Sequence, residues 1–319
     1  MKTFVLDVAA ESGGAWSVLR SFYDRFDGDG NEYVFCVSRE GLEDTRNIRV
    51  LRCDRVKKSR LHRLFFDYFV LPGLIKKSGC EKVLSLQNIA APRTKLPQTV
   101  YLHQALPYCE KRYSLRDEPG LWLYQHPIAR LIKKSLVKAD RVIVQTEWMK
   151  RAVVEKDGIY ADKIVVERYS APDEAAVPYD GTRDVFFYPA DHYVYKDHLT
   201  LLRACAELKD EEFRLILTID RSELKEEEAR LADELGGKLE LTGRLTFERV
   251  LGLYSKSVLV FPSLVETCAL PLYEARSSGA PIIAADLPYA REALSGYDRA
   301  NFFGPEDPDS LAGAMRRFL

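Results

Sequence analysis

Two glutamates in the second half of the chain frame the loop before a predicted helix. Glu266 follows an unbroken apolar run, 257–261, and Glu274 lies eight residues later, about one turn into a predicted helix. The start of a helix offers free N–H groups and a positive dipole end, which favour a phosphate. A carboxylate accepts two hydrogen bonds from neighbouring hydroxyls, such as those of a ribose. The pattern predicts a phosphate and diol site, although two glutamates on a solvated helix face would give the same spacing.

The segment around these glutamates has the pattern of a strand, a loop, a short helix and a second strand. The apolar runs 257–261 and 281–285 are typical of parallel strands buried on both faces. Pro271 suits a first helical turn, where its missing N–H is not needed, and Gly279 suits the left-handed residue that ends a helix. The segment is therefore predicted to be a βαβ unit.

A longer match extends this pattern to a known family. Glu-x7-Glu, with Leu-Pro between the glutamates and Glu-Ala-x3-Gly-x-Pro-x3-Ala after them, resembles the donor-site motif of the family 4 retaining glycosyltransferases. The segments 285–292 and 303–308 are also similar to that family. The resemblance implies an α/β protein with two Rossmann-like doubly wound domains facing a cleft, the GT-B fold. One departure is that Thr267-Cys268-Ala269 stands where the family has Gly-Phe-Gly, and side chains there narrow the approach of a phosphate to the backbone.

The resemblance assigns roles to residues of the second half. It implies that Glu274 holds the ribose, Glu266 the transferred sugar and Lys196 the diphosphate. Relatives place an Arg early in the Lys196 loop, where this chain has Asp191 and His192, so His192 is a candidate replacement. The other substrate-binding residues implied here are Arg244, near the base, and Thr267, Cys268, Ala269 and Leu270 before the helix. A solvated lysine and an ordinary surface turn are the alternatives for Lys196 and Arg244.

Candidates in the first half follow predicted strands. His103 ends a strand, and the carboxyl edge of a parallel sheet is where ligands bind. Its context, Tyr-Leu-His-Gln-x-Leu-Pro, resembles a bacterial polysaccharide-synthesis branch of the family, which implies that His103 contacts the sugar; a structural histidine is the alternative. Gln87 and Asn88 are candidates for sugar or acceptor hydroxyls. Gly13 and Gly14 suit either a close backbone approach to an anion or a plain strand-to-helix turn.

Length and alternation predict two domains. The 319 residues suffice for two domains of ordinary size, and 171–181 is rich in Pro, Gly and acidic residues. We predict an N-terminal domain at 1–172, a linker at 173–182 and a nucleotide-sugar domain at 183–319. Predicted strands span 3–8, 32–37, 82–85, 98–102, 141–145, 185–188, 214–219, 238–241, 257–261, 281–285 and 301–303. Predicted helices span 16–26, 61–77 and 121–138, and Asp307 to Ser310 caps a last one.

Composition excludes several classes of protein. The six cysteines are scattered without CxxC spacing, which argues against a disulfide framework or a zinc site and favours a reduced, cytoplasmic chain. Asp7 interrupts an N-terminal apolar stretch that is too short for a signal peptide, so a first strand is predicted there. Asp27-Gly-Asp29 supplies the DxD of metal-dependent sugar transferases, but it follows a helix and has turn chemistry, so no metal is assigned.

Charge divides unevenly along the chain. Residues 1–170 carry 30 Lys+Arg and 21 Asp+Glu, a net +9, and the remainder carries 17 and 27, a net −10. Two segments of the basic half, 55–66 and 129–138, combine basic and apolar residues at helical spacing. They are either amphipathic core helices or docking segments for an anionic lipid surface on the inner face of the cell membrane. No nucleic-acid recognition motif is present.

We therefore predict a metal-independent, retaining hexosyltransferase without a cofactor. Its donor would be a UDP-, GDP- or dTDP-sugar and its acceptor a saccharide or a lipid-linked saccharide. His103, Lys196 and Glu266 are the predicted catalytic residues, and the absence of an evident nucleophile fits the front-face mechanism proposed for the family. Two alternatives remain open: a nucleotide-sugar 2-epimerase of the same architecture, and a sugar-nucleotide-binding scaffold without turnover.

Overall fold

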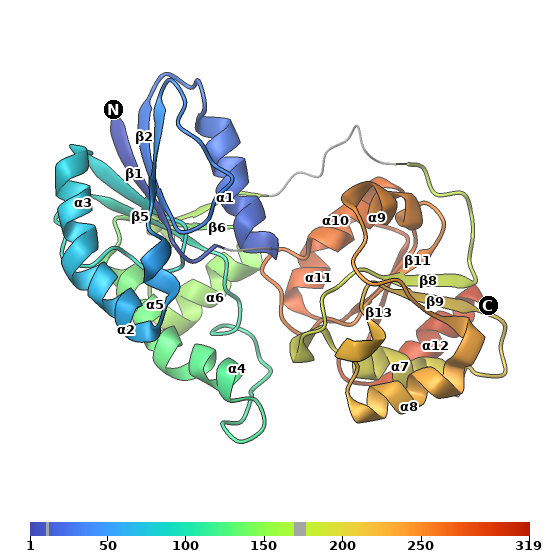
Figure 1. The fold of residues 1–319 in the computed structure, drawn as a ribbon. Helices are drawn as coiled ribbons and strands as arrows, with labels where there is room; N and C mark the ends of the chain where they lie inside the picture. The colour runs from blue at the N-terminus through green and yellow to red at the C-terminus, as the bar shows by residue number, and fades with distance from the viewer. Residues whose placement is uncertain (11–12, 169–176) are drawn as a thin grey trace. The chain divides into compact units, whose positions relative to one another are not determined.

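The computed structural model describes residues 1–10, 13–168 and 177–319, and the chain forms two compact units, 1–168 and 169–319 (Figure 1). Each unit is a parallel β-sheet covered by helices, and each is considered by itself. Of the predicted linker, residues 173–176 lie outside the described part of the chain. Among the described residues, no helix is both long enough and apolar enough to span a membrane.

The sheet of the N-terminal unit has seven parallel strands in the order β3-β2-β1-β4-β5-β6-β7. The order reverses between β1 and β4. The loops that follow these two strands therefore diverge, and such a switch point is where open α/β sheets bind ligands. The strands are β1 (Lys2–Asp7), β2 (Glu32–Val37), β3 (Ile48–Arg52), β4 (Lys82–Ser85), β5 (Gln98–Leu102), β6 (Arg141–Val144) and β7 (Ile164–Val166).

Helices cover both faces of this sheet. Along β1, Val5 belongs to a core shared with α1, whereas Phe4 and Leu6 belong to a second core shared with α3 and with Phe66 of the turn before it. The helices are α1 (Gly13–Phe26), α2 (Arg60–Phe65), α3 (Leu71–Ser78), α4 (Pro119–Leu123), α5 (Ala129–Lys138) and α6 (Glu147–Asp157). One π-helical stretch joins α2 to α3 (Phe66–Val70) and another joins α4 to α5 (Tyr124–Ile128), so the predicted helices 61–77 and 121–138 are each continuous.

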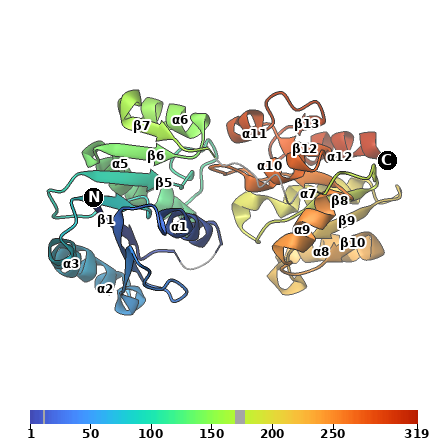
Figure 2. The same ribbon diagram turned by 90° about the horizontal axis from the view of Figure 1, so that it is seen from above.

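The C-terminal unit repeats the same topology with six parallel strands in the order β10-β9-β8-β11-β12-β13 (Figure 2). Its switch point lies between β8 and β11. The strands are β8 (Val185–Tyr188), β9 (Arg214–Leu217), β10 (Leu239–Leu241), β11 (Val258–Phe261), β12 (Ile282–Ala285) and β13 (Ala300–Phe303). The helices are α7 (His198–Glu207), α8 (Glu226–Leu235), α9 (Phe247–Tyr254), α10 (Leu270–Ser277), α11 (Pro288–Ala293) and α12 (Pro308–Met315).

Most predicted elements are present within two or three residues of their predicted ends. Every residue of β11 and β12 is buried, as the unbroken apolar runs indicate. Asp307 caps α12 by accepting a hydrogen bond from the N–H of Ser310 at 3.0 Å. The prediction omits β3 and β7, which are the two edge strands of the N-terminal sheet. Both are partly exposed and short, so neither has the continuous apolar run of a buried strand.

Candidate functional site

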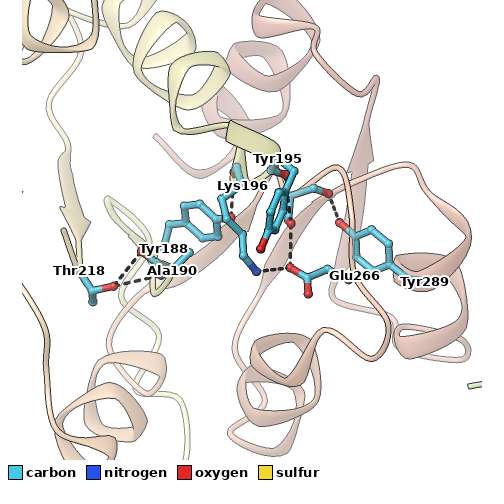
Figure 3. Close-up of polar contacts among 8 residues, drawn as sticks. Tyr188, Ala190, Tyr195, Lys196, Thr218, Glu266 and Tyr289 are labelled. Carbon is cyan, nitrogen blue, oxygen red and sulfur yellow. Dashed lines mark hydrogen bonds and ion pairs between the residues drawn. The ribbon is translucent and has the colours of Figure 1, made fainter. Parts of the chain in front are cut away.

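An ion pair joins the two loops at the switch point of the C-terminal sheet. Lys196 ends a short 3-10 turn (Val194–Lys196) after β8, and Glu266 lies in the loop after β11. The Lys196 Nζ donates to Oε1 of Glu266 (Figure 3), and both side chains are mostly buried, with 18% and 15% of their surface exposed. The structure thus brings together two of the predicted catalytic residues, on adjacent strands and at the ligand-binding edge of the sheet.

Neighbouring hydroxyls fix the position of this pair. Ser263 Oγ donates to Oε1 of Glu266 at 2.7 Å, and the Tyr289 hydroxyl donates to the backbone oxygen of Ser263. The Tyr188 hydroxyl donates to the backbone oxygen of Lys196 at 2.9 Å (Figure 3). Burial raises the pKa of both tyrosines well above the ordinary value, so both stay neutral donors. The ion pair is therefore held from two sides by buried groups that do not titrate near neutral pH.

The loop after β8 is fastened at its other side as well. The N–H of Ala190 donates to Thr218 Oγ1 at 3.0 Å, which ties this loop to the end of β9 (Figure 3). The Lys196 Nζ lies 5.8 Å from the ring centre of Tyr195 and 6.0 Å from that of Phe261, within the range of a cation–π interaction. Such a lysine has little freedom to leave the site.

Glu274, the second glutamate of the motif, lies inside the unit. It belongs to α10, and one of its carboxylate oxygens accepts a hydrogen bond from the Tyr254 hydroxyl at 2.9 Å. Burial raises the pKa of Glu274, and this hydrogen bond opposes the rise. Pro271 lies in the first turn of α10 and Gly279 has φ = +74°, so the predicted start and end of this helix are confirmed.

The residue before α10 adopts a conformation that favours glycine. Ala269 has φ = +56° and ψ = 59°, the left-handed region, which costs a residue with a Cβ about 1–2 kcal/mol. This is a position where the family pattern has glycine. Cys268 and Ala269 are both buried, whereas Thr267 and Leu270 are partly exposed. The backbone geometry of the loop is thus the one that glycine would adopt without strain.

Two further predicted residues of this unit lie elsewhere. His192 Nε2 is 2.8 Å from Oε2 of Glu228 on α8, and its ring lies 5.2 Å from that of His198. Burial would raise the pKa of Glu228, but the hydrogen bonds from His192 and from the N–H of Lys225 lower it. Arg244 follows β10 on an exposed bend. The structure therefore pairs His192 with a carboxylate and leaves Lys196 as the predicted cation beside Glu266.

In the N-terminal unit, a hydrogen bond connects the loops after β4 and β5. The N–H of His103 donates to Oδ1 of Asn88 at 2.8 Å, and Asn88 has φ = +65°. Burial lowers the pKa of His103 to about 4, so its imidazole is neutral at pH 7. Gln87 is buried beside Asn88. The structure thus brings His103 and Asn88 into contact, as their positions after neighbouring strands indicate.

Asp7 is a candidate functional residue that the sequence analysis does not identify, because there it only interrupts an apolar stretch. It ends β1, at the switch point of the N-terminal sheet, and its Oδ1 accepts hydrogen bonds from the N–H groups of Ala9 and Ala10 at 3.1 and 3.0 Å. Burial raises its pKa to about 6. Within the part of the chain that is described, Oδ2 of Asp7 and Oε1 of Gln87 are buried without a hydrogen-bond partner. A polar residue ending the first parallel strand was the signal available in the sequence.

The remaining predicted residues are the glycines and the Asp-Gly-Asp segment. Gly13 and Gly14 begin α1 a few residues after β1, and a Cβ added at Gly14 would meet no atom within 4 Å. Asp29 accepts hydrogen bonds from the N–H of Asn31 and the hydroxyl of Tyr33, which confirms a turn. Residues 1–10, 13–168 and 177–319 contain no group of three or more His, Cys, Asp or Glu side chains that could hold a metal ion.

Models of two families match the two units of the chain. The model described as Glycosyltransferase Family 4 matches residues 12–166. The model described as Glycosyl transferases group 1 matches residues 183–319. The two matches together leave only the first residues and the segment 167–182 uncovered.

Among characterised proteins, the chain is similar to bacterial mannosyltransferases. It is 21% identical to the O-antigen chain mannosyltransferase RfbU of Salmonella typhimurium over 266 residues, which are 82% of this chain and 72% of that protein. It is 25% identical to the serotype-specific mannosyltransferase WbdA of Escherichia coli over 256 residues, which are 73% of this chain and only 30% of WbdA.

Solved structures share the fold over nearly the whole chain. Sucrose-phosphate synthase from Thermosynechococcus elongatus aligns with a TM-score of 0.77 at 17% identity, over 99% of this chain and 88% of that one. HepE of Anabaena, solved in complex with UDP-glucose, aligns with a TM-score of 0.72 at 16% identity, over 99% of this chain and 89% of that one. At such identities these likenesses concern the fold alone.

Proposed function

Because the chain belongs to the family 4 glycosyltransferases and has their GT-B fold, we propose that it transfers a hexose from a nucleotide-diphosphate sugar to a saccharide or lipid-linked saccharide, with retention of configuration. The acceptor belongs to the synthesis of a bacterial surface polysaccharide, since RfbU is named for the O-antigen chain. The observation that carries this proposal is the contact between Lys196 and Glu266 at the switch point of the C-terminal sheet.

In this proposal, Lys196 exchanges its partner when the donor binds. The free site holds its positive charge against Glu266, where it is mostly out of water. A diphosphate brings two or more negative charges, so Lys196 can turn to it without becoming an unpaired buried charge. The leaving diphosphate gains charge as the glycosidic bond breaks, and Lys196 together with the N–H groups at the start of α10 stabilises that charge.

Glu266 then turns to the sugar, where its carboxylate accepts hydrogen bonds from hydroxyls and lies near developing positive charge. Its Oε1 also keeps the hydrogen bond from Ser263, which makes it a poor nucleophile and a good positioning group. The acceptor oxygen forms its bond to the anomeric carbon on the face from which the diphosphate departs. The acceptor proton passes to the departing diphosphate oxygen, so the step needs no enzyme nucleophile and leaves the configuration unchanged.

Two other residues, one in each unit, have proposed roles. The Tyr254 hydroxyl donates to one oxygen of the Glu274 carboxylate, and the carboxylate can still accept hydrogen bonds from the ribose hydroxyls. His103 contacts the transferred sugar as a neutral imidazole, in agreement with its pKa of about 4. A neutral ring both donates and accepts, which suits a hydroxyl group.

A panel of sugar nucleotides tests the proposal. The purified chain is incubated with UDP-, GDP- and dTDP-hexoses in EDTA, first without an acceptor and then with mannose oligosaccharides, and the products are read by NMR. GDP-mannose and UDP-glucose come first, because the relatives are named mannosyltransferases and HepE is solved with UDP-glucose. Release of the nucleotide diphosphate with an unchanged anomeric configuration in the product supports the proposal. Conversion of a donor into its 2-epimer indicates an epimerase, and binding without any turnover indicates a scaffold.

A further inference from the structure

The helical segment of α2 and the π turn after it exposes large apolar side chains to solvent. Leu61, Phe65 and Phe69 have 76%, 60% and 64% of their surface exposed, and Leu64 and Tyr68 are exposed beside them. The rings of Phe65 and Phe69 stack with centres 5.4 Å apart. Five neighbouring exposed side chains of this size, 61, 64, 65, 68 and 69, form the surface that we call the α2 face. A contiguous apolar surface of this kind marks an interaction site.

The opposite side of the same segment is anchored in the unit. Phe66, Leu71 and Ile75 are buried in the core beneath the sheet. Arg63 holds Asp67 at 2.8 Å on the half-buried side, so this acidic group lies away from the α2 face. In Figures 1 and 2, α2 and α3 follow each other along the periphery of the N-terminal unit. The α2 face thus lies on a helix that contributes no buried residue itself and that is anchored through the turn and the helix that follow it.

Positive charge surrounds the α2 face. Residues 54–77 carry seven Lys+Arg and two Asp+Glu, a net charge of 7 − 2 = +5. Arg55, Lys58 and Arg60 are exposed at the N-terminal end of the helix. The guanidinium of Arg93 lies 5.6 and 5.1 Å from the ring centres of Tyr68 and Phe69. An apolar stripe within a basic surround is the composition of helices that lie in the interface of an anionic bilayer.

The other basic and apolar segment of the sequence, α5, differs from this one. Its Ile132 and Leu136 are buried in the unit, and the exposed Leu131 and Val137 lie apart along the helix. The lysines of α5 remain on a solvated surface without a contiguous apolar stripe. Of the two segments, only the first has a surface that an apolar environment would cover.

We propose that the α2 face inserts into the headgroup region of an anionic lipid bilayer, with Leu61, Phe65 and Phe69 entering the acyl boundary and the flanking arginines and lysines contacting lipid phosphates. Charge complementarity favours this occupant. A second copy of the chain would bring two surfaces of net +5 together, whereas anionic headgroups neutralise them. This inference depends on neither the donor nor the reaction, so it can fail while the proposed function stands.

Co-sedimentation of the full chain with phosphatidylglycerol vesicles tests the inference. The wild type should partition onto phosphatidylglycerol vesicles, and Leu61→Ser/Phe65→Ser/Phe69→Ser should partition at least about tenfold more weakly, because burial of three large side chains is lost. Arg55→Glu/Lys58→Glu/Arg60→Glu should reduce partitioning by a similar factor and remove most of its salt dependence. Phosphatidylcholine vesicles should bind the wild type far less.

Two controls separate insertion from other causes. Phe247→Ser and Tyr160→Ser change exposed aromatic residues elsewhere and should leave partitioning unchanged. Phe65→Trp adds a fluorophore to the α2 face, and its added emission should shift to the blue with phosphatidylglycerol vesicles, while Tyr160→Trp should show no shift. Equal partitioning of wild type and the triple serine variant would overturn the inference. It would equally be overturned if the wild type self-associates in sedimentation velocity and the serine variant is monomeric, since the α2 face would then bind a second copy.

Discussion

The two units share one strand order, but their switch points differ in electrostatics. In the C-terminal unit, the edge at β8 and β11 carries a full positive and a full negative charge, Lys196 and Glu266, in direct contact. In the N-terminal unit, the edge at β1 and β4 carries buried acceptors, Oδ2 of Asp7 and Oε1 of Gln87, which have no partner in the described residues. His103, after β5, is neutral. Unpartnered buried atoms occur in both units, since both ring nitrogens of His198 at the start of α7 also lack a hydrogen-bond partner among the described residues. The difference between the two edges is therefore the ion pair of Lys196 and Glu266.

This difference indicates what each edge is suited to bind. A buried acceptor without a partner costs about 1–3 kcal/mol, so such groups are retained where a ligand can donate to them. Hydroxyl groups of a sugar are such donors. A buried ion pair, in contrast, can exchange one partner for another charged group. We therefore expect the C-terminal unit to hold the charged diphosphate and the N-terminal unit to hold neutral hydroxyls.

The largest expected effect comes from removing the cation. Lys196→Ala should lower kcat by a factor on the order of 10²–10³, because a preorganised group that stabilises the leaving charge is lost. Steady-state kinetics with the donor identified by the panel would measure this. Lys209→Ala is the matched control, since Lys209 forms an exposed ion pair with Glu234 and should leave kcat unchanged. Near-normal turnover of Lys196→Ala would show that another cation serves the diphosphate.

Lys196→Ala also leaves Glu266 as a buried charge without its partner, so a loss of folding could imitate a loss of catalysis. The double variant Lys196→Ala/Glu266→Gln removes both charges of the pair. Because Glu266 also has a proposed role in the reaction, this double variant reports on folding: a regained melting temperature would show that the unpaired charge of Glu266 destabilises Lys196→Ala. The kcat of Lys196→Ala is therefore measured well below the melting temperature of that variant. We expect the double variant to regain the melting temperature and to stay inactive.

Replacing Glu266 should mainly lower kcat, whereas replacing Glu274 should mainly lower the affinity for the nucleotide. Glu266→Ala releases Lys196 from its partner, so the affinity for the free nucleotide diphosphate should be kept or increased while kcat falls. Glu274→Gln keeps an acceptor for the Tyr254 hydroxyl but loses the charge offered to the ribose. Hydrogen bonds to a charged acceptor contribute about 1.5–3 kcal/mol, so its affinity should fall about tenfold to a hundredfold. Calorimetry with the free nucleotide measures both, and identical behaviour of the two variants would contradict the assignment.

The sequence predicts the edge that carries the ion pair better than the edge of the N-terminal unit, for a physical reason. Lys196 and Glu266 lie 70 residues apart, yet each follows a strand with an unbroken apolar run, and parallel strands place their carboxyl ends at one edge. Asp7 is the last residue of such a strand, but its significance depends on burial and on an unpartnered oxygen. The pairing of His192 with Glu228 joins the loop after β8 to α8, and no local pattern indicates it.

The α2 face could not be predicted from the sequence either, because its exposure depends on packing. Basic and apolar residues at helical spacing predict an amphipathic helix at both 55–66 and 129–138. Spacing cannot tell which apolar residues face the core. The π turn Phe66–Val70 changes the phase of the helix between α2 and α3, so the exposed side of α2 is decided by packing.

The buried carboxylate of the N-terminal edge should make stability depend on pH. The pKa of Asp7 in the folded state is about 6, above its ordinary 3.8, so the folded state binds the proton more tightly than the unfolded state. Stability is therefore lost as the pH rises from about 4 to 6, and the shift corresponds to about 3 kcal/mol. Relative to the wild type, Asp7→Asn should gain about that much in its free energy of unfolding between pH 4 and pH 8. Urea unfolding at several pH values measures this.

An exposed carboxylate of the same unit supplies the control for Asp7. Hydrogen bonds from Tyr33 and Asn31 lower the pKa of Asp29 below its usual value. Its ionised form therefore favours the folded state, and stability from this group is lost as the pH falls. Asp29→Asn should accordingly shift the pH profile in the direction opposite to Asp7→Asn. A flat difference between wild type and Asp7→Asn would show that water or another group satisfies Asp7.

The smallest expected effect concerns Ala269, in the loop before α10 whose N–H groups are proposed to bind the diphosphate. Ala269 has φ = +56°, so replacing it by glycine removes the steric cost of the left-handed conformation but adds freedom to the unfolded chain. The net result of Ala269→Gly should be a gain of about 0.5–1 kcal/mol in the free energy of unfolding. Ala275→Gly, a buried helical position of α10, is the matched control and should lose about 1 kcal/mol. Because Ala269→Gly keeps the backbone conformation, its affinity for the nucleotide diphosphate should match or exceed that of the wild type. A loss of both stability and affinity would show that the Cβ of Ala269 contributes packing that outweighs the strain.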